Sequence, residues 1–183
     1  MWPLGHLAVA YLLYALARRV RSLGPPLVLP VVALAIGSQF PDLVDKPLAW
    51  YLGALPTGRT LAHSLLVLVP VSIVVYAATR RLGRSELGVA FAIGALSHAL
   101  VDALPALWGA GEARFLLWPV LSVEPYETGV PSIAELFRQS LGDPYFLSEF
   151  VLAAIALYVW RGHGYPGTEP VIARIQRTFG HRT

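Results

Sequence analysis

Five apolar runs, separated by short polar or proline-containing stretches, dominate the pattern of hydrophobic and polar positions along the chain. They cover residues 3–17, 25–40, 61–78, 86–107 and 145–160. A helix needs about 20 apolar residues to cross a bilayer, within a range of about 17 to 25. Several runs reach that length only when polar residues at their ends lie at the membrane edge. We therefore predict an all-α, multi-pass bundle of about five transmembrane helices within residues 1–160.

Two regions outside these runs carry further patterns. Residues 115–119 are apolar but too few to cross a membrane, which indicates an interfacial or re-entrant lip. Ser132 and Glu135 have the spacing of a capping box and predict a short helix through residue 141. Residues 161–183 form a second unit, a basic cytoplasmic tail, whose apolar and arginine residues are typical of an amphipathic helix on the membrane surface.

The composition adds to this interpretation. Hydrophobic residues make up 56% of the 183 residues and charged residues only 14%, whereas ordinary globular domains carry about 25% charge. The mean hydropathy is +0.59. These values exclude a disordered chain, a charged solenoid and a nucleic-acid binder, so the expected partner is the lipid bilayer. The absence of cysteine excludes disulfides, a thiol nucleophile and cysteine-ligated metals.

The distribution of charge predicts the orientation. When the N-terminus is placed outside and five helices alternate, ten of the 14 basic residues lie in inside segments, and nine of the 11 acidic residues lie outside or at outer helix ends. Cytoplasmic segments are enriched in Lys and Arg. Trp2, Trp50, Trp108 and Trp118 fall at the outer interface, where aromatic belts form. We therefore expect a multi-pass cell-membrane protein with its N-terminus outside and its C-terminus inside.

Few ionisable residues interrupt the predicted helices, and such groups inside a membrane are costly and usually functional. All fall in the half of the membrane that the predicted orientation makes the outer one. They are His6, Asp42, His63, His98 and Asp102, with Asp45 and Glu149 close by. His98 and Asp102 are four residues apart and share one helix face. Arg59 has the same spacing from His63, which we place one turn into the third helix.

Imidazoles and carboxylates from separate helices form the ligand set expected of a divalent ion such as Zn²⁺ or Mn²⁺. We therefore predict metal ligands at five positions: His6, Asp42, His63, His98 and Asp102. The same groups could instead form buried hydrogen bonds or a proton relay. Glu149 could pair with Arg138 or lie among lipid headgroups, and His163 and His181 are interpreted as surface residues of the tail.

The order of these motifs resembles a known family. The chain has His6, then Pro41-Asp42, Arg59-Thr60-Leu61-Ala62-His63-Ser64, Ser97-His98-Ala99-Leu100-Val101-Asp102 and, later, Trp118-Pro119. Over residues 1–105 this pattern resembles the membrane-bound metal-dependent hydrolases, which include the LexA-regulated inner-membrane hydrolases. Residues 40–47 resemble an archaeal branch of that family. The resemblance implies a hydrolase whose metal is held by these His and Asp residues.

More distantly, the order His, Asp, His and His-x-x-x-Asp is similar to that of zinc-dependent phospholipase C and related single-strand nucleases, which are helical phosphodiesterases. Their three-metal sites use further His and Glu residues after the last motif. Here the later Glu candidates are Glu112, Glu124, Glu127 and Glu149, and no later His lies in a predicted membrane helix. The resemblance therefore implies one or two ions, with zinc the expected metal.

These observations predict metal-assisted hydrolysis of a phosphoester or lipid-linked substrate at the outer membrane interface. Asp45 or Glu149 would act as general base or orient a ligand, and Arg59 would bind an anionic substrate group. Trp118 and the lip of residues 115–119 would control access. Two alternatives stay open, an intramembrane cation or proton transporter and a non-catalytic, metal-stapled scaffold. A cluster confined to one half of the membrane and the lack of internal repeats favour the hydrolase over a transporter.

Overall fold

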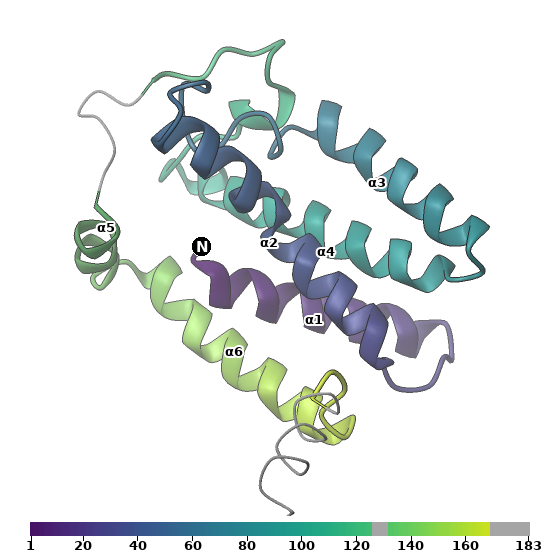
Figure 1. Cartoon of the computed structure of the whole chain (residues 1–183). Helices are drawn as coiled ribbons and strands as arrows, with labels where there is room; N and C mark the ends of the chain where they lie inside the picture. Colours follow the sequence, from purple (N-terminus) through teal and green to yellow (C-terminus); the bar gives the residue numbers. More distant parts are fainter. Residues whose placement is uncertain (126–131, 169–183) are drawn as a thin grey trace, which may run out of the picture.

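The computed structural model describes residues 1–125 and 132–168, and within these residues the chain is helical with no strand. The elements in chain order are α1 (Pro3–Val20), α2 (Val28–Trp50), α3 (Leu65–Arg81), α4 (Ser85–Ala103), η1 (Leu104–Trp108), η2 (Arg114–Leu117), α5 (Ile133–Ser140) and α6 (Pro144–Gly162), where η marks a 3₁₀-helix (Figure 1). The predicted all-α class is confirmed for the described part of the chain.

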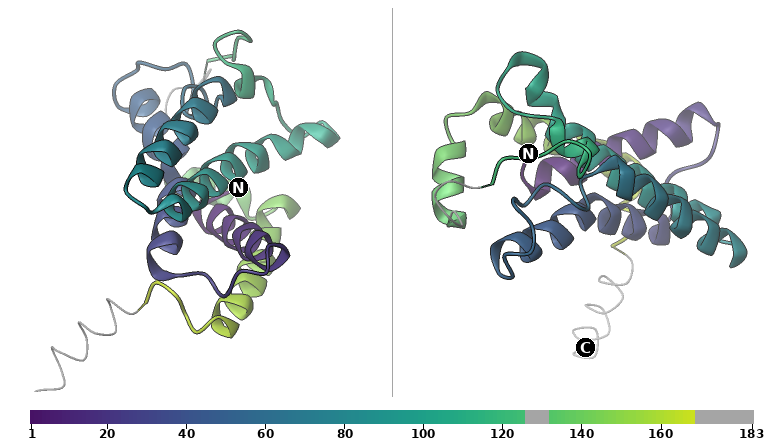
Figure 2. Two further views of the ribbon diagram at one scale, coloured as in Figure 1. Left: turned by 90° about the vertical axis from the view of Figure 1, so that its right-hand side faces the viewer. Right: turned by 90° about the horizontal axis from the view of Figure 1, so that it is seen from above.

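Helix α4 lies at the centre of the bundle. Its main neighbours are α2 and α3, while α1 packs on both α4 and α2, and α6 packs chiefly on α1 (Figures 1 and 2). Helix α5 lies apart from the long helices, beside the N-terminus (Figure 1). Trp2 contacts this helix, because its ring meets Phe137 edge to face at 5.4 Å and its indole N–H donates to Ser140 Oγ at 3.1 Å.

Small residues allow α2 and α4 to approach closely. A Cβ atom on Gly94 would lie 2.4 Å from the carbonyl oxygen of Leu34, and one on Gly37 would lie 2.3 Å from that of Phe91. Ala95 and Ala99, further along α4, have no exposed surface. Helices in lipid associate through close packing of this kind, because water does not drive them together.

Two predicted helix boundaries are wrong. Helix α2 does not end at Pro41-Asp42 but continues through Pro41 and Pro47 to Trp50. A proline removes one backbone hydrogen bond, but an unwound turn in an apolar environment would leave more groups unpaired, so the helix persists. Helix α3 begins only at Leu65, because Ser64 caps it by accepting a hydrogen bond from Leu66 N at 3.2 Å. His63 therefore precedes the third helix instead of lying one turn inside it.

Among the described residues, three helices are long and apolar enough to cross a membrane: α2, α4 continued through η1, and α6. Helices α1 and α3 have 18 and 17 residues, so a total of five spans remains a prediction. Large apolar side chains cover the outside of the bundle. Val74 on α3 is 67% exposed and Val151 on α6 is 61% exposed, as expected of surfaces that face lipid.

The shorter predicted elements are partly described. Ser132 caps α5, since its Oγ accepts from Glu135 N at 3.1 Å, as the capping-box spacing predicted. The lip contains η2, whose four residues are too few to span. Helix α6 ends at Gly162, and residues 163–168 fold back toward α2, where Gly167 lies against Val31. Glu127 and the predicted amphipathic helix of the tail lie outside the described residues.

Candidate metal centre

Four segments bring the five predicted ligands to one end of the bundle. His6 comes from the first turns of α1 and Asp42 from the second half of α2; His63 lies between α2 and α3, and α4 carries His98 and Asp102 near its end. They form two groups that could each hold a metal ion, His6–His98–Asp102 and Asp42–His63–His98, and within each group the ligand atoms lie within 4.8 Å of one another. His98 belongs to both groups, and its ring stacks on that of His6 at 3.6 Å.

The hydrogen bonds of two histidines fix where their lone pairs point. His63 Nδ1 lies 2.8 Å from Asp45 Oδ2, and His98 Nδ1 lies 2.6 Å from the carbonyl oxygen of Ser38. A carboxylate and a carbonyl only accept hydrogen bonds, so each Nδ1 carries a proton, and in the neutral form of each ring Nε2 then carries the lone pair. These two Nε2 atoms lie 3.2 Å apart. With both rings neutral, two lone pairs face each other at this distance, and a proton or a metal ion between them would remove their repulsion.

A carboxylate oxygen completes this group. Asp42 Oδ1 is buried without a hydrogen-bond partner, 3.6 Å from His63 Nε2 and 3.7 Å from His98 Nε2. Its other oxygen accepts from Lys46 Nζ at 2.6 Å, one turn along α2. Buried acceptors without donors are rare and costly in folded proteins. A cation between Asp42 Oδ1 and the two Nε2 atoms would satisfy this carboxylate oxygen, so the chemistry of these three atoms fits a metal ion.

His63 is neutral in this setting. Burial lowers the pKa of His63, and the hydrogen bond to Asp45 opposes that effect only in part. A neutral imidazole is the form that binds metal, because a protonated ring has no lone pair left to donate. The loop that carries His63 thus presents the ligand in the right protonation state at neutral pH.

Asp45 holds this loop in place. Its carboxylate accepts from the backbone N–H groups of Thr60 and Ala62, each at 2.8 Å, from that of His63 at 3.2 Å, and from His63 Nδ1. Asp45 has no exposed surface. Of the two roles predicted for it, this geometry matches the orientation of a ligand, because both of its oxygens are already occupied by donors.

The second group is already compensated by positive charge. Asp102 Oδ1 accepts from the amino group of Met1 at 2.9 Å and lies 3.2 Å from His6 Nε2, while Asp102 Oδ2 accepts from Arg59 Nε at 2.7 Å. His6 Nδ1 is buried without a hydrogen-bond partner. His6 and Asp102 can therefore extend the first group, in which Asp42 Oδ1 lacks a donor.

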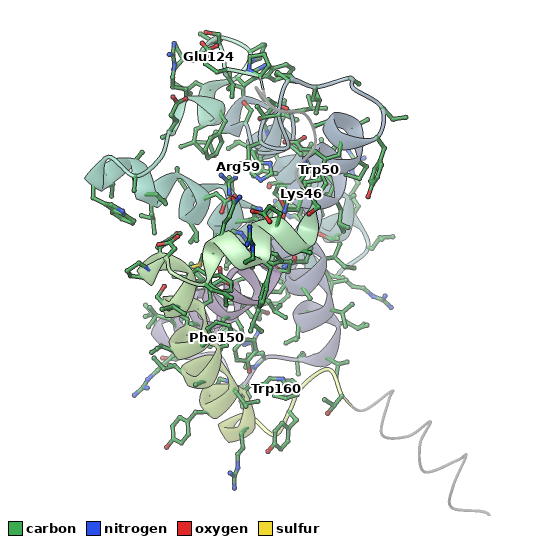
Figure 3. All side chains as sticks on the ribbon, turned by 90° about the vertical axis from the view of Figure 1, so that its left-hand side faces the viewer. Lys46, Trp50, Arg59, Glu124, Phe150 and Trp160 are labelled. Carbon is green, nitrogen blue, oxygen red and sulfur yellow. The ribbon has the colours of Figure 1, made fainter. Side chains whose placement is uncertain are left out.

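Arg59 contacts the candidate site, but not through the helical relation to His63 that the sequence predicted. Residues 59 and 63 do not lie on a helix, so Arg59 is not one helical turn from His63. Its side chain contacts Asp102 instead and is 49% exposed. Figure 3 shows Arg59 and Lys46 in the half of the bundle remote from Trp160. Arg59 therefore joins the buried ligand group to the surface of the molecule.

Glu149 lies in α6 but binds backbone N–H groups at the start of α1. Its carboxylate accepts from the backbone N–H groups of Trp2 and, at 3.2 Å, of Gly5, and the side chain is 1% exposed. It does not pair with Arg138, which binds Glu135 at 2.9 Å. The hydrogen bonds of Glu149 therefore go to the helix that carries His6 and to none of the ligand side chains, so a general-base role has no geometric support.

Sequence reasoning missed several residues that shape the site. Ser64 Oγ donates to the carbonyl oxygen of Trp118 at 2.6 Å and ties the lip to the loop of His63. Phe115, 4% exposed, meets the His63 ring edge to face at 5.9 Å. The i, i+4 spacing of Asp42 and Lys46 could have predicted their ion pair. No sequence pattern predicts that the backbone carbonyl of Ser38 accepts from His98. The lip thus covers one side of the ligand group.

A family model described as YdjM inner membrane protein matches residues 1–165. The chain belongs to the YdjM inner membrane protein family. The match spans α1 through α6 and so includes all five candidate ligands. No curated protein and no solved structure matches the chain. Membership in YdjM, together with the three long apolar helices, identifies a membrane protein with a His/Asp group that could hold a metal. An archaeal branch and a phospholipase C-like activity stay predictions.

Proposed function

We propose that this YdjM-family protein is a membrane-embedded, metal-dependent hydrolase that acts on a phosphoester or lipid-linked substrate at the outer membrane interface. One observation carries the proposal. His63 Nε2, His98 Nε2 and Asp42 Oδ1 converge inside the bundle, and Asp42 Oδ1 is buried without a hydrogen-bond donor. Two imidazoles and one carboxylate are also the ligand set of well-known hydrolytic zinc sites.

Zinc suits the spacing of these atoms. Zn–N distances of about 2.0–2.1 Å in a tetrahedral site separate two nitrogen ligands by about 3.3 Å. The observed separation of the two Nε2 atoms is 3.2 Å. Because the two candidate groups share His98 and the second is partly neutralised by Arg59, we propose one primary ion, with His6 and Asp102 as further ligands to it or to a second ion.

The residues around the group have separate roles in this proposal. A bound divalent ion supplies a Lewis acid that polarises a phosphoryl oxygen and activates water. Asp45 fixes the tautomer and the position of His63, and Lys46 holds the second oxygen of Asp42. Arg59, half-exposed beside Asp102, binds the anionic group of the substrate. The lip of residues 115–119 limits access from one side.

The membrane setting favours a substrate at the outer interface. Five spans with the N-terminus outside would place ten of the 14 basic residues inside. The candidate ligands then lie at the outer ends of their helices, at the depth of lipid headgroups. A lipid-linked phosphoester presents its reactive group at this depth, which makes it the proposed substrate class.

Elemental analysis of the detergent-purified protein tests the metal. We expect at least one equivalent of a divalent transition metal in the wild type and loss of most of it in His98→Ala and in the isosteric Asp42→Asn. His163→Ala is the matched control, because His163 bonds Tyr11 and belongs to neither candidate group. A metal-free wild type after purification in metal-replete medium would refute the proposal.

Hydrolysis of a generic phosphodiester, bis(p-nitrophenyl) phosphate, tests the activity in the metal-loaded protein. Asp42→Asn should remove turnover, whereas Arg59→Gln should mainly raise KM, because it removes a contact to the anion and leaves the primary ligands in place. A metal-loaded wild type that cleaves neither this probe nor phospholipids would favour the non-catalytic scaffold instead.

A further inference from the structure

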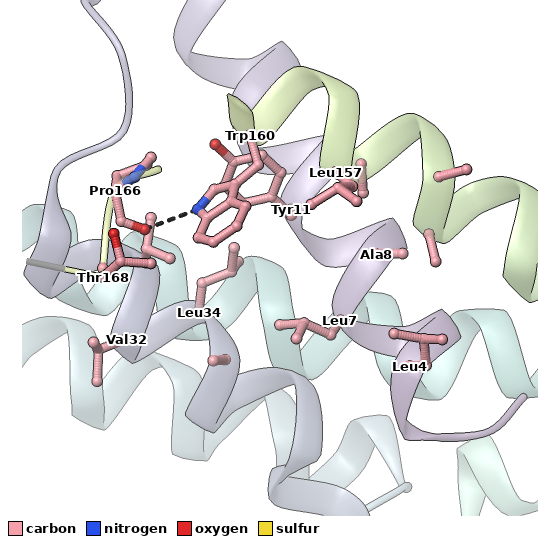
Figure 4. A pocket seen from close by; sticks show the side chains of 16 residues that line it. Leu4, Leu7, Ala8, Tyr11, Val32, Leu34, Leu157, Trp160, Pro166 and Thr168 are labelled. Atoms are coloured by element: carbon pink, nitrogen blue, oxygen red, sulfur yellow. Dashed lines mark hydrogen bonds between the residues drawn. The ribbon is translucent and has the colours of Figure 1, made fainter. Parts of the chain in front are cut away.

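Away from the candidate metal centre, α1, α2 and α6 enclose an apolar hollow of about 540 Å³ (Figure 4). Its lining includes Leu7 and Ala8 from α1, Leu34 from α2, and Leu157 and Trp160 from α6. Helix α6 packs chiefly on α1 and not on α2, and the hollow is the space that remains between α6 and α2. Volumes of 300–1,000 Å³ are usual for small-molecule sites.

A second hollow of about 510 Å³ lies at the C-terminal end of α1. Its lining includes Arg18, Arg19, Ser22 and His163. Tyr11 lines the apolar hollow, and its hydroxyl lies 2.8 Å from His163 Nδ1. His163 is therefore not the isolated surface residue that the sequence indicated, because this hydrogen bond joins the walls of the two hollows.

The second hollow carries net positive charge. Arg18 pairs with Glu86 at 2.7 Å and donates to the carbonyl oxygen of Gly24, so its charge is compensated. Arg19 forms no ion pair among the described residues. Arg161 lies in the last turn of α6, at the same end of the α1–α6 pair as His163. An anion bound there would meet uncompensated guanidinium charge.

The apolar hollow extends along α1 from Leu4 to Tyr11, and the second hollow lies at the end of α1 remote from His6. Helices α2 and α6 are two of the three long enough to cross a membrane. Arg19 lies 13 positions after His6 on α1, which corresponds to roughly 20 Å along the helix. A molecule that fills both hollows must be apolar along most of its length and anionic at the membrane surface.

We propose that the two hollows form one binding site for an anionic phospholipid, with an acyl chain in the apolar hollow and the phosphate beside Arg19. Basic pockets between membrane helices are a known means of headgroup recognition. Charge complementarity favours such a lipid over a second copy of this chain, which would bring its own arginines to the same end. The site is distinct from the candidate metal centre and holds whether or not the protein is a hydrolase.

Native mass spectrometry of the full chain tests the proposal. The protein is reconstituted in vesicles of equal parts phosphatidylglycerol and phosphatidylcholine with identical acyl chains, then released in mild detergent. We expect one retained phospholipid, with phosphatidylglycerol preferred about fivefold, as one basic residue at the membrane surface implies. Equal retention of the two lipids by the wild type, or no retained lipid, would overturn the proposal.

Two variants separate the hollows. Leu157→Trp fills the apolar hollow and should lower lipid retention severalfold, whereas Ile155→Trp, on the opposite face of α6 and similarly exposed, should not. Arg19→Gln should keep the retained lipid but abolish the preference for phosphatidylglycerol. Equal retention in the two tryptophan variants, or a lipid-free dimer that Leu157→Trp dissociates, would contradict the site.

Discussion

At the scale of single residues, the candidate centre depends on what binds the far side of each imidazole. Asp45 and the carbonyl of Ser38 accept from the Nδ1 atoms of His63 and His98 and thereby turn both Nε2 lone pairs inward. Partners of this kind orient metal-binding histidines and raise their basicity. Residues that do not contact the proposed ion thus fix the orientation of two of its ligands.

The first prediction concerns Asp45→Asn. An amide replaces one of the two oxygens by an NH2 group, which would face either the N–H of Ala62 or those of Thr60 and His63, so the loop that carries His63 should shift. We expect metal affinity to fall about 10- to 100-fold, measured by competition with a chromophoric chelator. Asp143→Asn, at the exposed cap of α6, is the control and should bind like the wild type. Unchanged affinity in Asp45→Asn would remove its orienting role.

At the scale of elements, the site depends on how closely α2 approaches α4. Ser38 and Asp42 lie on α2, and His98 and Asp102 lie on α4. A Cβ atom on Gly94 would lie 2.7 Å from Ser38 N. The contact between the two backbones therefore sets the distance between ligands on different helices.

The second prediction is that Gly94→Ala destabilises the bundle. The added methyl group meets backbone atoms that cannot move aside, and overpacking of this kind costs about 1–3 kcal/mol. The apparent Tm in detergent, followed by circular dichroism, should fall. Gly162→Ala is the control, because a Cβ atom there has nothing within 4 Å. Equal Tm values for the two variants would show that α2 and α4 can separate without penalty.

The elements also show how far the sequence predicts the structure. Long apolar runs locate α1, α2, α4 and α6, because length and hydropathy suffice to mark a helix in lipid. The runs did not reveal that α2 passes through Pro41, since a local rule for proline ignores the apolar surroundings that keep the helix intact. The i, i+4 relation of Arg59 to His63 failed because it presumes a helix where Asp45 binds a loop.

The candidate ligands were easier to find than their partners. His6 and His98 stand out because ionisable groups are scarce in membrane helices. The role of Ser38 depends on its own carbonyl oxygen meeting His98 of α4, and that of Glu149 on backbone N–H groups of α1, so both become visible only when the helices are packed.

At the scale of the whole molecule, the two ends of the bundle differ in chemistry. One end gathers the acidic and imidazole groups of the candidate metal centre, and the other gathers arginines, among them Arg18, Arg19, Arg80 and Arg81. A charge asymmetry of this kind sets orientation during membrane insertion.

The third prediction follows from that asymmetry. A reporter inserted at Arg84, in the short connection between α3 and α4, and a reporter fused to the C-terminus should both lie in the cytoplasm. Reporter pairs active on only one side of the membrane, such as alkaline phosphatase and green fluorescent protein, measure this directly. A reporter after residue 54, between α2 and α3, is the control and should lie outside. Either of the first two found outside would reverse the topology.

The cap that α6 provides for α1 also bears on how the protein is made. Every candidate ligand has been synthesised once residue 102 is complete, yet the N–H groups of Trp2 and Gly5, at the start of the His6 helix, also donate to Glu149 of α6. Helix α1 is thus capped by a residue of α6, which is synthesised later. A nascent chain that stops before α6 contains all five candidate ligands but lacks Glu149, which binds the first turn of the helix that carries His6. Complete packing around His6 therefore requires that α6 has been synthesised and has joined the bundle.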